Sequence, residues 1–430
     1  ADPDFGNLDT SGPLEGAGGG TGGAGGPVRP RVDFSRHLVR IGPMMIVQRI
    51  QCYHYNEAFN IPFHSPQANR LRADSVIVCI DCGPDGRGWG ESAPRPYVSG
   101  EDCHSVAALI VDRFAPILLK ASIDSRAALQ AVLEHLETVC KEMRLTAYNS
   151  ALGAVDLALL DALERSQRIS SHELFPLIQR EELRLSLSVP FLPLEVIEKY
   201  FPMFQAHVDV SVIKVLVSED AEETYARVQL LRHLAHPDVE LRLEFNGKSS
   251  LARVRAYLEH IAPLAPSAVE QPLPSGCFDG LRQLREDYDL NLVADESLVT
   301  FEDAERLVQN GAYNIFNIKV SKCGGLLRAM KIAQLASRHG IKCQVGTHVG
   351  ESKLLGIAGR RLARSLPNFD CYGGGSEVLF SQFLNLHQGI EGDAWPPAAN
   401  RDIFTHQNLD ALLSECRLLS DTGPTTRNGH

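Results

Sequence analysis

The 430-residue chain lacks several features that mark specialised classes of protein. It contains no apolar run of the ~18 residues that a transmembrane helix needs, so no membrane span is expected. It also lacks an excess of basic residues. The formal net charge of −11 disfavours an extended nucleic-acid surface, although a local cationic pocket remains open. The sequence therefore predicts neither membrane nor nucleic-acid partners.

The chain has no dense cysteine framework either, because its ten cysteines are scattered along the sequence. A chain of this length can bury sizeable cores without disulfides. We therefore expect reduced thiols and a cytoplasmic location. Cys79 and Cys82 form a Cys-x-x-Cys pair, but it lies in a strand-like run and no second cysteine or histidine pair accompanies it. That context disfavours a redox or zinc role for the pair.

The N-terminal segment, residues 1–35, contains the glycine-rich run LEGAGGGTGGAGGPVRP. Such composition predicts a flexible tail outside the fold. No apolar stretch precedes it, so we do not expect a signal peptide. The whole chain is 44% hydrophobic and 22% charged, which is ordinary for a globular protein of one or two domains.

Residues 44–170 change from strand-like to helical patterns. Strand candidates fill residues 44–95 around the turn GPDGRG, and helical spacing of apolar residues follows from 101 to 170. Strands followed by a run of helices predict an α+β domain.

Residues 183–385 alternate strand and helix candidates. The strand candidates are LRLSLSVPF, VSVIKVLV, VELRLEF, SAVEQPL, LNLVADES, NIFNIKV and IKCQVGT, with an eighth candidate at NFDCYGG. This alternation predicts an α/β fold of the (β/α)₈ barrel type. A doubly wound sheet is the alternative, but the glycine-rich phosphate turn expected after its first strand is missing. Residues 386–430 are irregular, and we expect them to pack back on the first domain.

Three acidic residues and a lysine recur at near-constant spacing after these strands. Glu244, Glu270, Asp295 and Lys319 are 26, 25 and 24 residues apart. In a parallel barrel, the C-terminal ends of successive strands converge on one mouth. Clustered carboxylates need a cation to hold them together, and an all-oxygen site suits Mg²⁺. We therefore predict a Mg²⁺ site made by the three acids, with Lys319 beside it.

The lysines near these strands have different predicted roles. Beside a dication and apolar walls, the ammonium form of Lys319 would be disfavoured, which suits a general base. Lys214 lies between Val212 and Leu216 on the inner face of its strand, so it needs a carboxylate partner or a catalytic role. Lys322 is predicted to be a solvent-facing loop lysine.

Further candidates flank the same strand ends. Asn246 would point the same way as Glu244 and could bind a ligand or a metal-bound water. His348, after the seventh strand, is a candidate acid or substrate contact, and Glu351 could pair with a lysine across the mouth. Gly324 and Gly325 mark a tight turn or a close approach to a ligand.

Several motifs together resemble the enolase superfamily, in its muconate-lactonizing and mandelate-racemase-like branch. They are GWGESAPRPYVSGE, AYNSALGAVDLALLDAL, VEQP, ADES, IKVSKCGG and QVGTHVGES followed by LLGIAGRRLA, over about residues 45–385. The resemblance implies a capping domain over a barrel. It also implies Mg²⁺ on three acids and abstraction of a proton α to a carboxylate in a small-molecule substrate. The family often forms symmetric assemblies, so a homo-oligomer is expected.

Two positions depart from the pattern of this branch. The second strand normally carries Lys-x-Lys, and here Lys214 is followed two residues later by Leu216, which occupies the usual second base position. Glu244 stands where the branch usually has aspartate, which moves the carboxylate by one methylene. Substrate specificity in the branch comes from two capping loops, so His64, Arg95 and Tyr97 are candidate substrate contacts. Arg95 could grip an anionic group or form a surface salt bridge.

The leading hypothesis is a Mg²⁺-dependent lyase or isomerase of the muconate cycloisomerase type in which Lys319 acts from one face of the substrate. Elimination or cycloisomerisation suits one base. Epimerisation requires Lys214 or His348 to supply a second proton. The alternative is a non-catalytic ligand-binding protein on the same scaffold.

Overall fold

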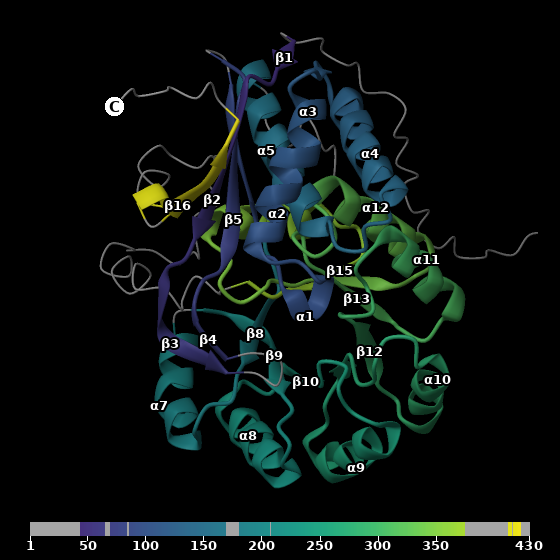
Figure 1. Ribbon diagram of the computed structural model, residues 1–430. Helices are drawn as coiled ribbons and strands as arrows, with labels where there is room; N and C mark the ends of the chain where they lie inside the picture. The colour runs from purple at the N-terminus through teal and green to yellow at the C-terminus, as the bar shows by residue number, and fades with distance from the viewer. Residues whose placement is uncertain are drawn as a thin grey trace, which may run out of the picture. The chain divides into compact units, whose positions relative to one another are not determined.

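The computed structural model describes residues 44–64, 69–83, 86–168, 180–206, 208–374, 412–414 and 416–422. The predicted tail, residues 1–35, lies outside them. The predicted fold class is confirmed: the chain forms a closed eight-stranded parallel barrel with an N-terminal α+β capping domain (Figure 1). Within the described residues, no helix is both long and apolar enough to cross a membrane.

The barrel contains all eight strand candidates. Its strands are β8 (Leu185–Val189), β9 (Val210–Leu216), β10 (Glu240–Glu244), β11 (Ala268–Glu270), β12 (Asn291–Ala294), β13 (Ile315–Ile318), β14 (Lys342–Val345) and β15 (Phe369–Tyr372). Neighbouring strands pair in parallel, and β15 closes the ring on β8. The weakest sequence candidate, at 368–374, is therefore the strand that completes the barrel.

Helices follow the barrel strands and cover them on the outside (Figure 1). They are α7 (Leu194–Gln205), α8 (Ala221–Leu234), α9 (Leu251–Ile261), α10 (Phe278–Asp287), α11 (Phe301–Asn310), α12 (Leu326–Arg338) and α13 (Lys353–Ser365). The alternating pattern predicted helices between the barrel strands, but no candidate was recognised at α7. That helix contains Pro202 in its interior, a residue that disfavours helices.

The capping domain combines antiparallel strands with helices. Its strands are β1 (Met45–Ile46), β2 (Arg49–Tyr55), β3 (Ala58–His64), β4 (Asn69–Arg72), β5 (Ser75–Asp81), β6 (Arg87–Ser92) and β7 (Ser122–Ile123). Its helices are α1 (Pro96–Ser99), α2 (Cys103–Leu109), a π-helical turn (Ile110–Phe114), α3 (Ala115–Leu118), α4 (Arg126–Glu142) and α5 (Asn149–Gln167). The C-terminal strand β16 (Cys416–Asp421) joins this domain by pairing antiparallel with β2.

Two glycines of the GWGES segment allow α5 to lie directly on the cap sheet. A Cβ atom added at Gly88 would come within 2.0 Å of the Ala158 carbonyl oxygen, and one at Gly90 within 2.0 Å of the Ala154 carbonyl oxygen. No larger residue fits at either position without moving the helix. The cap core is thus built by backbone-to-backbone packing of α5 on β6.

Buried polar contacts fasten the cap to the barrel. Glu91 of β6 is fully buried and accepts hydrogen bonds from the backbone N–H groups of Ser352 and Leu355, at 3.0 and 3.1 Å, at the start of α13. Asp156 of α5 accepts one from Leu327 at the start of α12, at 3.1 Å. Each carboxylate lies at a helix N-terminus, where unpaired N–H groups favour negative charge. Burial nevertheless raises the pKa of Asp156 to about 7.

The contact between barrel and cap explains why glycine is needed in the predicted turn at Gly324 and Gly325. Gly325 has a φ of 105°, and a Cβ there would lie 2.2 Å from Asp156 Oδ2. The close approach is therefore to the capping domain. The domain limits taken from sequence stay predictions, and most of residues 386–430 lies outside the described residues.

Candidate active site

Three carboxylates meet at the C-terminal mouth of the barrel. Glu244 and Glu270 are the last residues of β10 and β11 and lie in register, and Asp295 directly follows β12. One oxygen from each of the three lies within 4.8 Å of the other two. All three side chains are buried. The near-constant spacing in the sequence therefore corresponds to a single cluster.

Glu270 is the most enclosed of the three acids, with no exposed surface. Its carboxylate accepts a hydrogen bond from Asn317 Nδ2 at 2.7 Å and another from Gln344 Nε2 at 3.1 Å. Lys214 Nζ lies 3.1 Å from its Oε2. Burial raises the pKa of Glu270, against the effect of the Lys214 ammonium.

Lys214 bridges two of the acids from inside the barrel. Its Nζ is 3.1 Å from Glu270 Oε2 and 3.3 Å from Glu244 Oε2. Burial alone would lower the pKa of Lys214, but the carboxylates of Glu244 and Glu270 outweigh burial and raise it. The predicted need for a carboxylate partner is met twice. This geometry makes Lys214 a counter-ion of the cluster, and its catalytic role stays a prediction.

A network of polar side chains inside the barrel supports the acidic cluster. Arg242, two residues before Glu244, donates to Asp370 Oδ2 at 2.6 Å and to Gln344 Oε1 at 3.1 Å. Gln344 in turn donates to Glu270. Because each buried charge has a partner, the orientation of Glu270 is fixed by side chains from several strands.

Asp295 is held by two lysines. Lys319 Nζ lies 2.6 Å from its Oδ2, and Lys322 Nζ lies 2.5 Å from its Oδ1 and 2.7 Å from its carbonyl oxygen. Burial opposes ionisation of Asp295, but the two ammonium groups lower its pKa strongly. The interpretation of Lys322 as a solvent-facing lysine is wrong, because its side chain has no exposed surface.

The sequence-based prediction of a lowered pKa for Lys319 assumed that a dication is bound beside it. Burial lowers the pKa of Lys319, but Asp295 and the other nearby carboxylates together outweigh burial and raise it. The ammonium of Lys319 is therefore favoured in the structure described here. The side chain is 12% exposed, whereas that of Lys322 is fully buried, so Lys319 is the lysine that solvent can reach.

Glu244 and its neighbours form the side of the cluster where the sequence departs from the family pattern. Asn246 has a φ of 54° and donates from Nδ2 to Glu244 Oε1 at 3.0 Å. Leu216, at the end of β9, pairs in register with Glu244 and is 3% exposed. The β9 residue that pairs in register with Glu244 is therefore apolar and cannot transfer a proton.

His348 and Glu351 lie after β14, next to the cap. The Nδ1 atom of His348 lies 2.9 Å from the Ala93 carbonyl oxygen, so it is the protonated nitrogen of a neutral ring. Its Nε2 is buried and has no hydrogen-bond partner among the described residues. Burial, followed by the charges of Lys319 and Arg95, lowers the pKa of His348 well below its usual value. Glu351 accepts a hydrogen bond from the His348 backbone N–H.

The three candidate substrate contacts in the cap have different surroundings. Arg95 is fully buried and donates from Nη1 to the carbonyl oxygens of Asp74, at 2.9 Å, and Pro94, at 2.6 Å, and from Nη2 to that of Val349. The surface salt-bridge alternative for Arg95 is therefore wrong. Tyr97 is 43% exposed, and His64 is an exposed residue of the β3–β4 hairpin. Their contact with substrate stays a prediction.

Sequence analysis missed Asn317, Gln344 and Lys322 as partners of the acidic cluster. A signal for two of them was present. Asn317 lies two residues before Lys319, so both face the barrel interior, and it is in register with Gln344. Lys322 follows Lys319 by three residues in a turn that returns it to Asp295, which strand periodicity does not reveal.

The cluster fits a small divalent cation such as Mg²⁺. Its donors are carboxylate oxygens, which are the ligands that Mg²⁺ prefers, and each acid lies at a strand end of a rigid barrel. The ammonium groups of Lys214, Lys319 and Lys322 now balance the three carboxylates. Glu244, Glu270 and Asp295 are thus the residues that would hold the ion.

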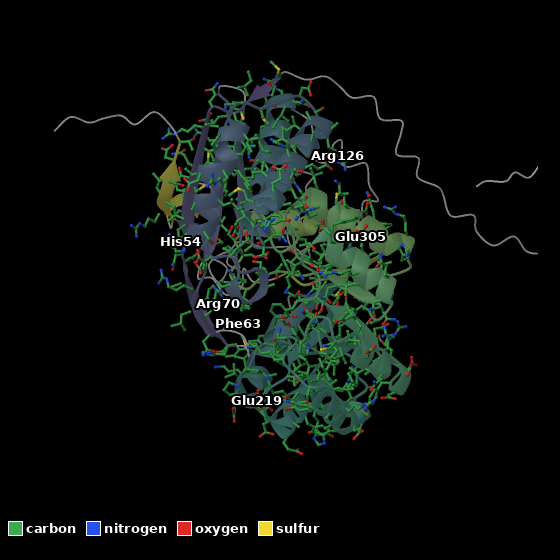
Figure 2. All side chains as sticks on the ribbon, turned by 45° about the vertical axis from the view of Figure 1, so that its right-hand side comes forward. His54, Phe63, Arg70, Arg126, Glu219 and Glu305 are labelled. Carbon is green, nitrogen blue, oxygen red and sulfur yellow. The ribbon has the colours of Figure 1, made fainter. Side chains whose placement is uncertain are left out.

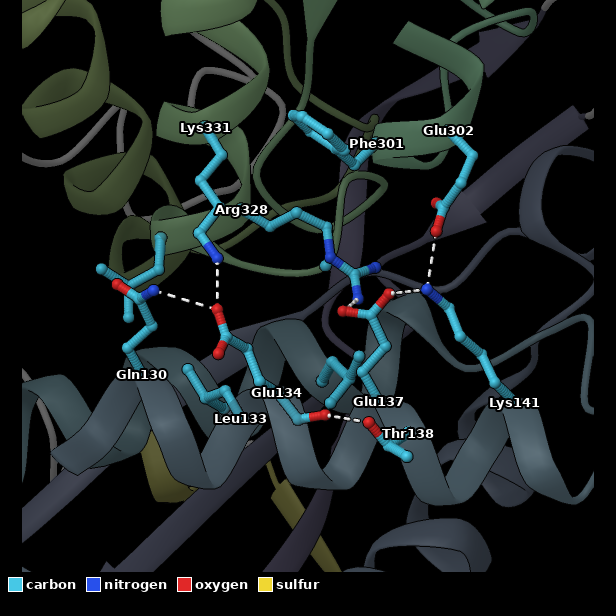
Figure 3. Close-up of a pocket in the computed structure, with 13 residues that line it drawn as sticks. Gln130, Leu133, Glu134, Glu137, Thr138, Lys141, Phe301, Glu302, Arg328 and Lys331 are labelled. Atoms are coloured by element: carbon cyan, nitrogen blue, oxygen red, sulfur yellow. Dashed lines mark hydrogen bonds and ion pairs between the residues drawn. The ribbon is translucent and has the colours of Figure 1, made fainter. Parts of the chain in front are cut away.

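A cavity of about 470 Å³ lies between α4 of the cap and helices α11 and α12, and none of the three acids lines it (Figure 3). Its charged groups are already paired. Lys331 binds Glu134 and Lys141 binds Glu302, both at 2.6 Å, and Arg328 binds Glu137. We therefore assign the chemistry to the barrel mouth and no ligand to this cavity.

The barrel matches a known family. The profile described as "Enolase C-terminal domain-like" matches residues 195–388. The L-Ala-D/L-Glu epimerase of Bacillus subtilis is 29% identical over 321 residues, covering 72% of this chain and 83% of that protein. Muconate cycloisomerase 1 of Rhodococcus opacus is 25% identical over 350 residues, covering 80% and 90%.

Solved structures agree with these relatives. The substrate-liganded complex of the L-Ala-D/L-Glu epimerase from Bacillus subtilis superposes with a TM-score of 0.71 at 26% identity, covering 78% of this chain and 92% of that chain. The similarity thus spans cap and barrel together. The resemblance of the chain to the enolase superfamily, in its muconate-lactonizing and mandelate-racemase-like branch, is thus confirmed by the matching profile and these relatives.

Proposed function

We propose that this protein is a Mg²⁺-dependent enzyme that removes the proton α to a carboxylate of a small-molecule substrate. The observation that carries the proposal is the position of Lys319, whose Nζ lies 2.6 Å from Asp295 within the cluster that also contains Glu244 and Glu270. A base beside a set of metal-binding carboxylates is the arrangement that enolisation requires. The relatives are enzymes, and no finding favours the non-catalytic alternative.

The charge of the cluster supports a carboxylate substrate. Three carboxylates and three ammonium groups cancel in the chain alone. A dication on the acids would leave this group of side chains positive, which favours binding of an anion. A bound Mg²⁺ would supply positive charge against the negative charge that develops on the substrate carboxylate.

The other side chains of the site have separate roles in the proposed reaction. Lys319, the more exposed of the two lysines on Asp295, takes the α proton. Lys214, Asn317 and Gln344 fix Glu270 in place. The buried walls and the cap exclude water from the reacting atoms, which strengthens the electrostatic interactions at the mouth.

Because of Leu216, the proposed enzyme has a base on only one face of the bound substrate. It occupies the β9 position beside Glu244, where the branch normally has a second lysine. With a base on one face only, the enzyme suits elimination or cycloisomerisation more directly than inversion of a stereocentre.

Epimerisation is the second candidate, and a specific observation favours it. Several relatives act as epimerases or racemases, among them the L-Ala-D/L-Glu epimerase of Bacillus subtilis. The Nε2 of His348 is buried without a hydrogen-bond partner among the described residues, and burial, followed by the charge of Lys319, lowers the pKa of the His348 ring. In this variant of the proposal, His348 or Lys214 exchanges the proton on the second face.

The experiment is deuterium uptake from D₂O at the α carbon of carboxylate substrates, followed by NMR. The panel holds Ala-Glu dipeptides, N-succinyl-arginine, N-succinyl-lysine and muconate. The proposal predicts exchange or turnover of at least one compound class with Mg²⁺ and none after chelation. Exchange with retained configuration indicates one-base chemistry, and inversion indicates epimerisation. Binding of these compounds without Mg²⁺-dependent exchange would contradict the proposal.

A further inference from the structure

A second cluster of metal-binding side chains lies in the capping domain, away from the barrel acids. His54 comes from β2, Asp74 from the turn between β4 and β5, and Cys103 from the first position of α2. One donor atom of each, an imidazole nitrogen, a carboxylate oxygen and a sulfur, lies within 4.8 Å of the other two. Figure 2 labels His54 on the strand side of the cap.

The donors converge on one oxygen. His54 Nε2 lies 2.8 Å and Cys103 Sγ lies 3.1 Å from the same atom, Asp74 Oδ1. The three segments are also fixed independently of the cluster. His54 pairs in register with Val76 of β5, and Asp102 forms a capping box that sets the start of α2. The convergence is therefore a property of the folded cap and not of flexible side chains alone.

We propose that His54, Asp74 and Cys103 bind a zinc ion. Nitrogen, sulfur and oxygen donors in this combination suit Zn²⁺, which binds them at ~2.0–2.3 Å. Ligand atoms on such an ion lie about 3.3–3.8 Å apart by tetrahedral geometry. The present separations from Asp74 Oδ1 need to widen by only several tenths of an ångström. Mg²⁺ is a poor match because it prefers oxygen ligands alone.

The cluster is open to ions from solution on one side. The side chain of Asp74 is 42% exposed and that of His54 is 19% exposed, while Cys103 is buried. His104, an exposed residue of α2, has its ring centroid 6.4 Å from that of His54. The fourth coordination position therefore faces solvent, where water or His104 completes the site.

Two nearby cationic side chains oppose the binding of Zn²⁺ at this cluster, and the negative charges of its own ligands favour it. Arg70 Nη1 lies 4.0 Å from Asp74 Oδ2, and Arg95 holds the Asp74 carbonyl oxygen, so two cations lie nearby. The carboxylate and a thiolate supply two negative charges that offset Zn²⁺. On binding, the Cys103 thiol releases its proton to solvent and the His54 proton moves from Nε2 to Nδ1, which frees both donor atoms.

The site has a structural consequence for the cap. Arg95 donates to the Asp74 carbonyl oxygen and to the Val349 carbonyl oxygen of the barrel. An ion on Asp74 would therefore stabilise the segment that anchors the cap to the loop after β14. Because the ion binds the native state, it should raise the melting temperature.

Cobalt substitution tests the site. The full chain is freed of metal with chelator, saturated with Mg²⁺ to occupy the barrel acids and titrated with Co²⁺. A thiolate-to-cobalt charge-transfer band distinguishes the cap site from the barrel cluster, because the barrel cluster contains no sulfur. The proposal predicts this band at one equivalent, Zn²⁺ displacing it, and a rise in melting temperature with Zn²⁺.

Variants assign the band to its ligands. Cys103→Ser should lose the band and weaken Zn²⁺ binding by on the order of 100-fold or more, since even outer-shell changes weaken metal sites by ~10–100-fold. His54→Asn, at a partly exposed position, should weaken binding while leaving the metal-free melting temperature close to wild type. Cys277→Ser is the matched control, because Cys277 is an exposed free cysteine outside both clusters. No band in the wild type, a band that survives in Cys103→Ser, or a band lost in Cys277→Ser would overturn the proposal.

Discussion

Leu216 lies directly beside Glu244, in register on adjacent parallel strands at the mouth of the barrel. One residue is apolar and the other is a ligand candidate of the acidic cluster. In the proposed function, this pair leaves one face of a bound substrate without a proton-transfer group at the β9 position.

Replacing Leu216 with lysine should therefore add a second base. The new ammonium would lie beside the Glu244 carboxylate, which offsets part of the cost of burying it. We expect Leu216→Lys to increase inversion of the α carbon relative to elimination or retained exchange, measured by chiral chromatography of the products. Leu216→Met is the control, since it conserves volume and should cost less than ~1.5 kcal/mol of stability without adding inversion. Equal inversion in both variants would contradict one-sided chemistry.

The ammonium of Lys214 and a bound Mg²⁺ ion should compete for the carboxylates of Glu244 and Glu270. The Lys214 ammonium contacts both Glu244 and Glu270, so Lys214→Met leaves two buried carboxylates without their cation. We expect a loss of about 3–5 kcal/mol in the free energy of unfolding without Mg²⁺. The stabilisation by Mg²⁺ should become larger than in wild type, as urea titrations with and without the ion would show. An unchanged Mg²⁺ effect would indicate that the ion does not bind these acids.

Arg95 should act as a fastener between cap and barrel. Its guanidinium donates to carbonyl oxygens of Asp74 and Pro94 on the cap side and of Val349 on the barrel side. Arg95→Lys cannot reproduce this fork of donors, so it should cost about 2–3 kcal/mol of stability. Hydrogen exchange should increase in the segment around Val349. Arg87→Lys, at a largely exposed ion pair, is the control and should change stability by less than ~1 kcal/mol.

The fold was largely predictable because each barrel strand carries an apolar run, and the four successive strands β10 to β13 end in, or are followed by, an ionisable residue. Glu244, Glu270, Asp295 and Lys319 recur at one spacing, and the structure brings them to one mouth. The positions that escaped prediction depend on contacts between distant segments. Lys322 is buried by a turn back to Asp295, and Arg95 is buried where the cap meets the loop after β14. No local pattern carries that information.

Glu351 should make stability depend on pH. Burial, with a smaller contribution from Glu91, raises its pKa from 4.5 to about 8. The folded state therefore binds this proton more tightly than the unfolded state does. The resulting stabilisation is complete below pH 4.5 and is lost as the pH rises to about 8. Glu351→Gln should remove on the order of 3–5 kcal/mol of this pH dependence, measured by urea unfolding across that range. A wild-type stability that rises over the same range would contradict the assignment.

The most direct test of the central claim is α-proton exchange in D₂O by the Mg²⁺-loaded enzyme, in wild type and in two lysine variants. Lys319→Met removes the proposed base, and Lys342→Met removes an exposed lysine at the start of the neighbouring strand β14. We predict exchange in wild type and Lys342→Met, and a decrease of about 10²–10⁴-fold in Lys319→Met with its melting temperature still raised by Mg²⁺. Undiminished exchange in a folded, Mg²⁺-binding Lys319→Met protein would contradict the account.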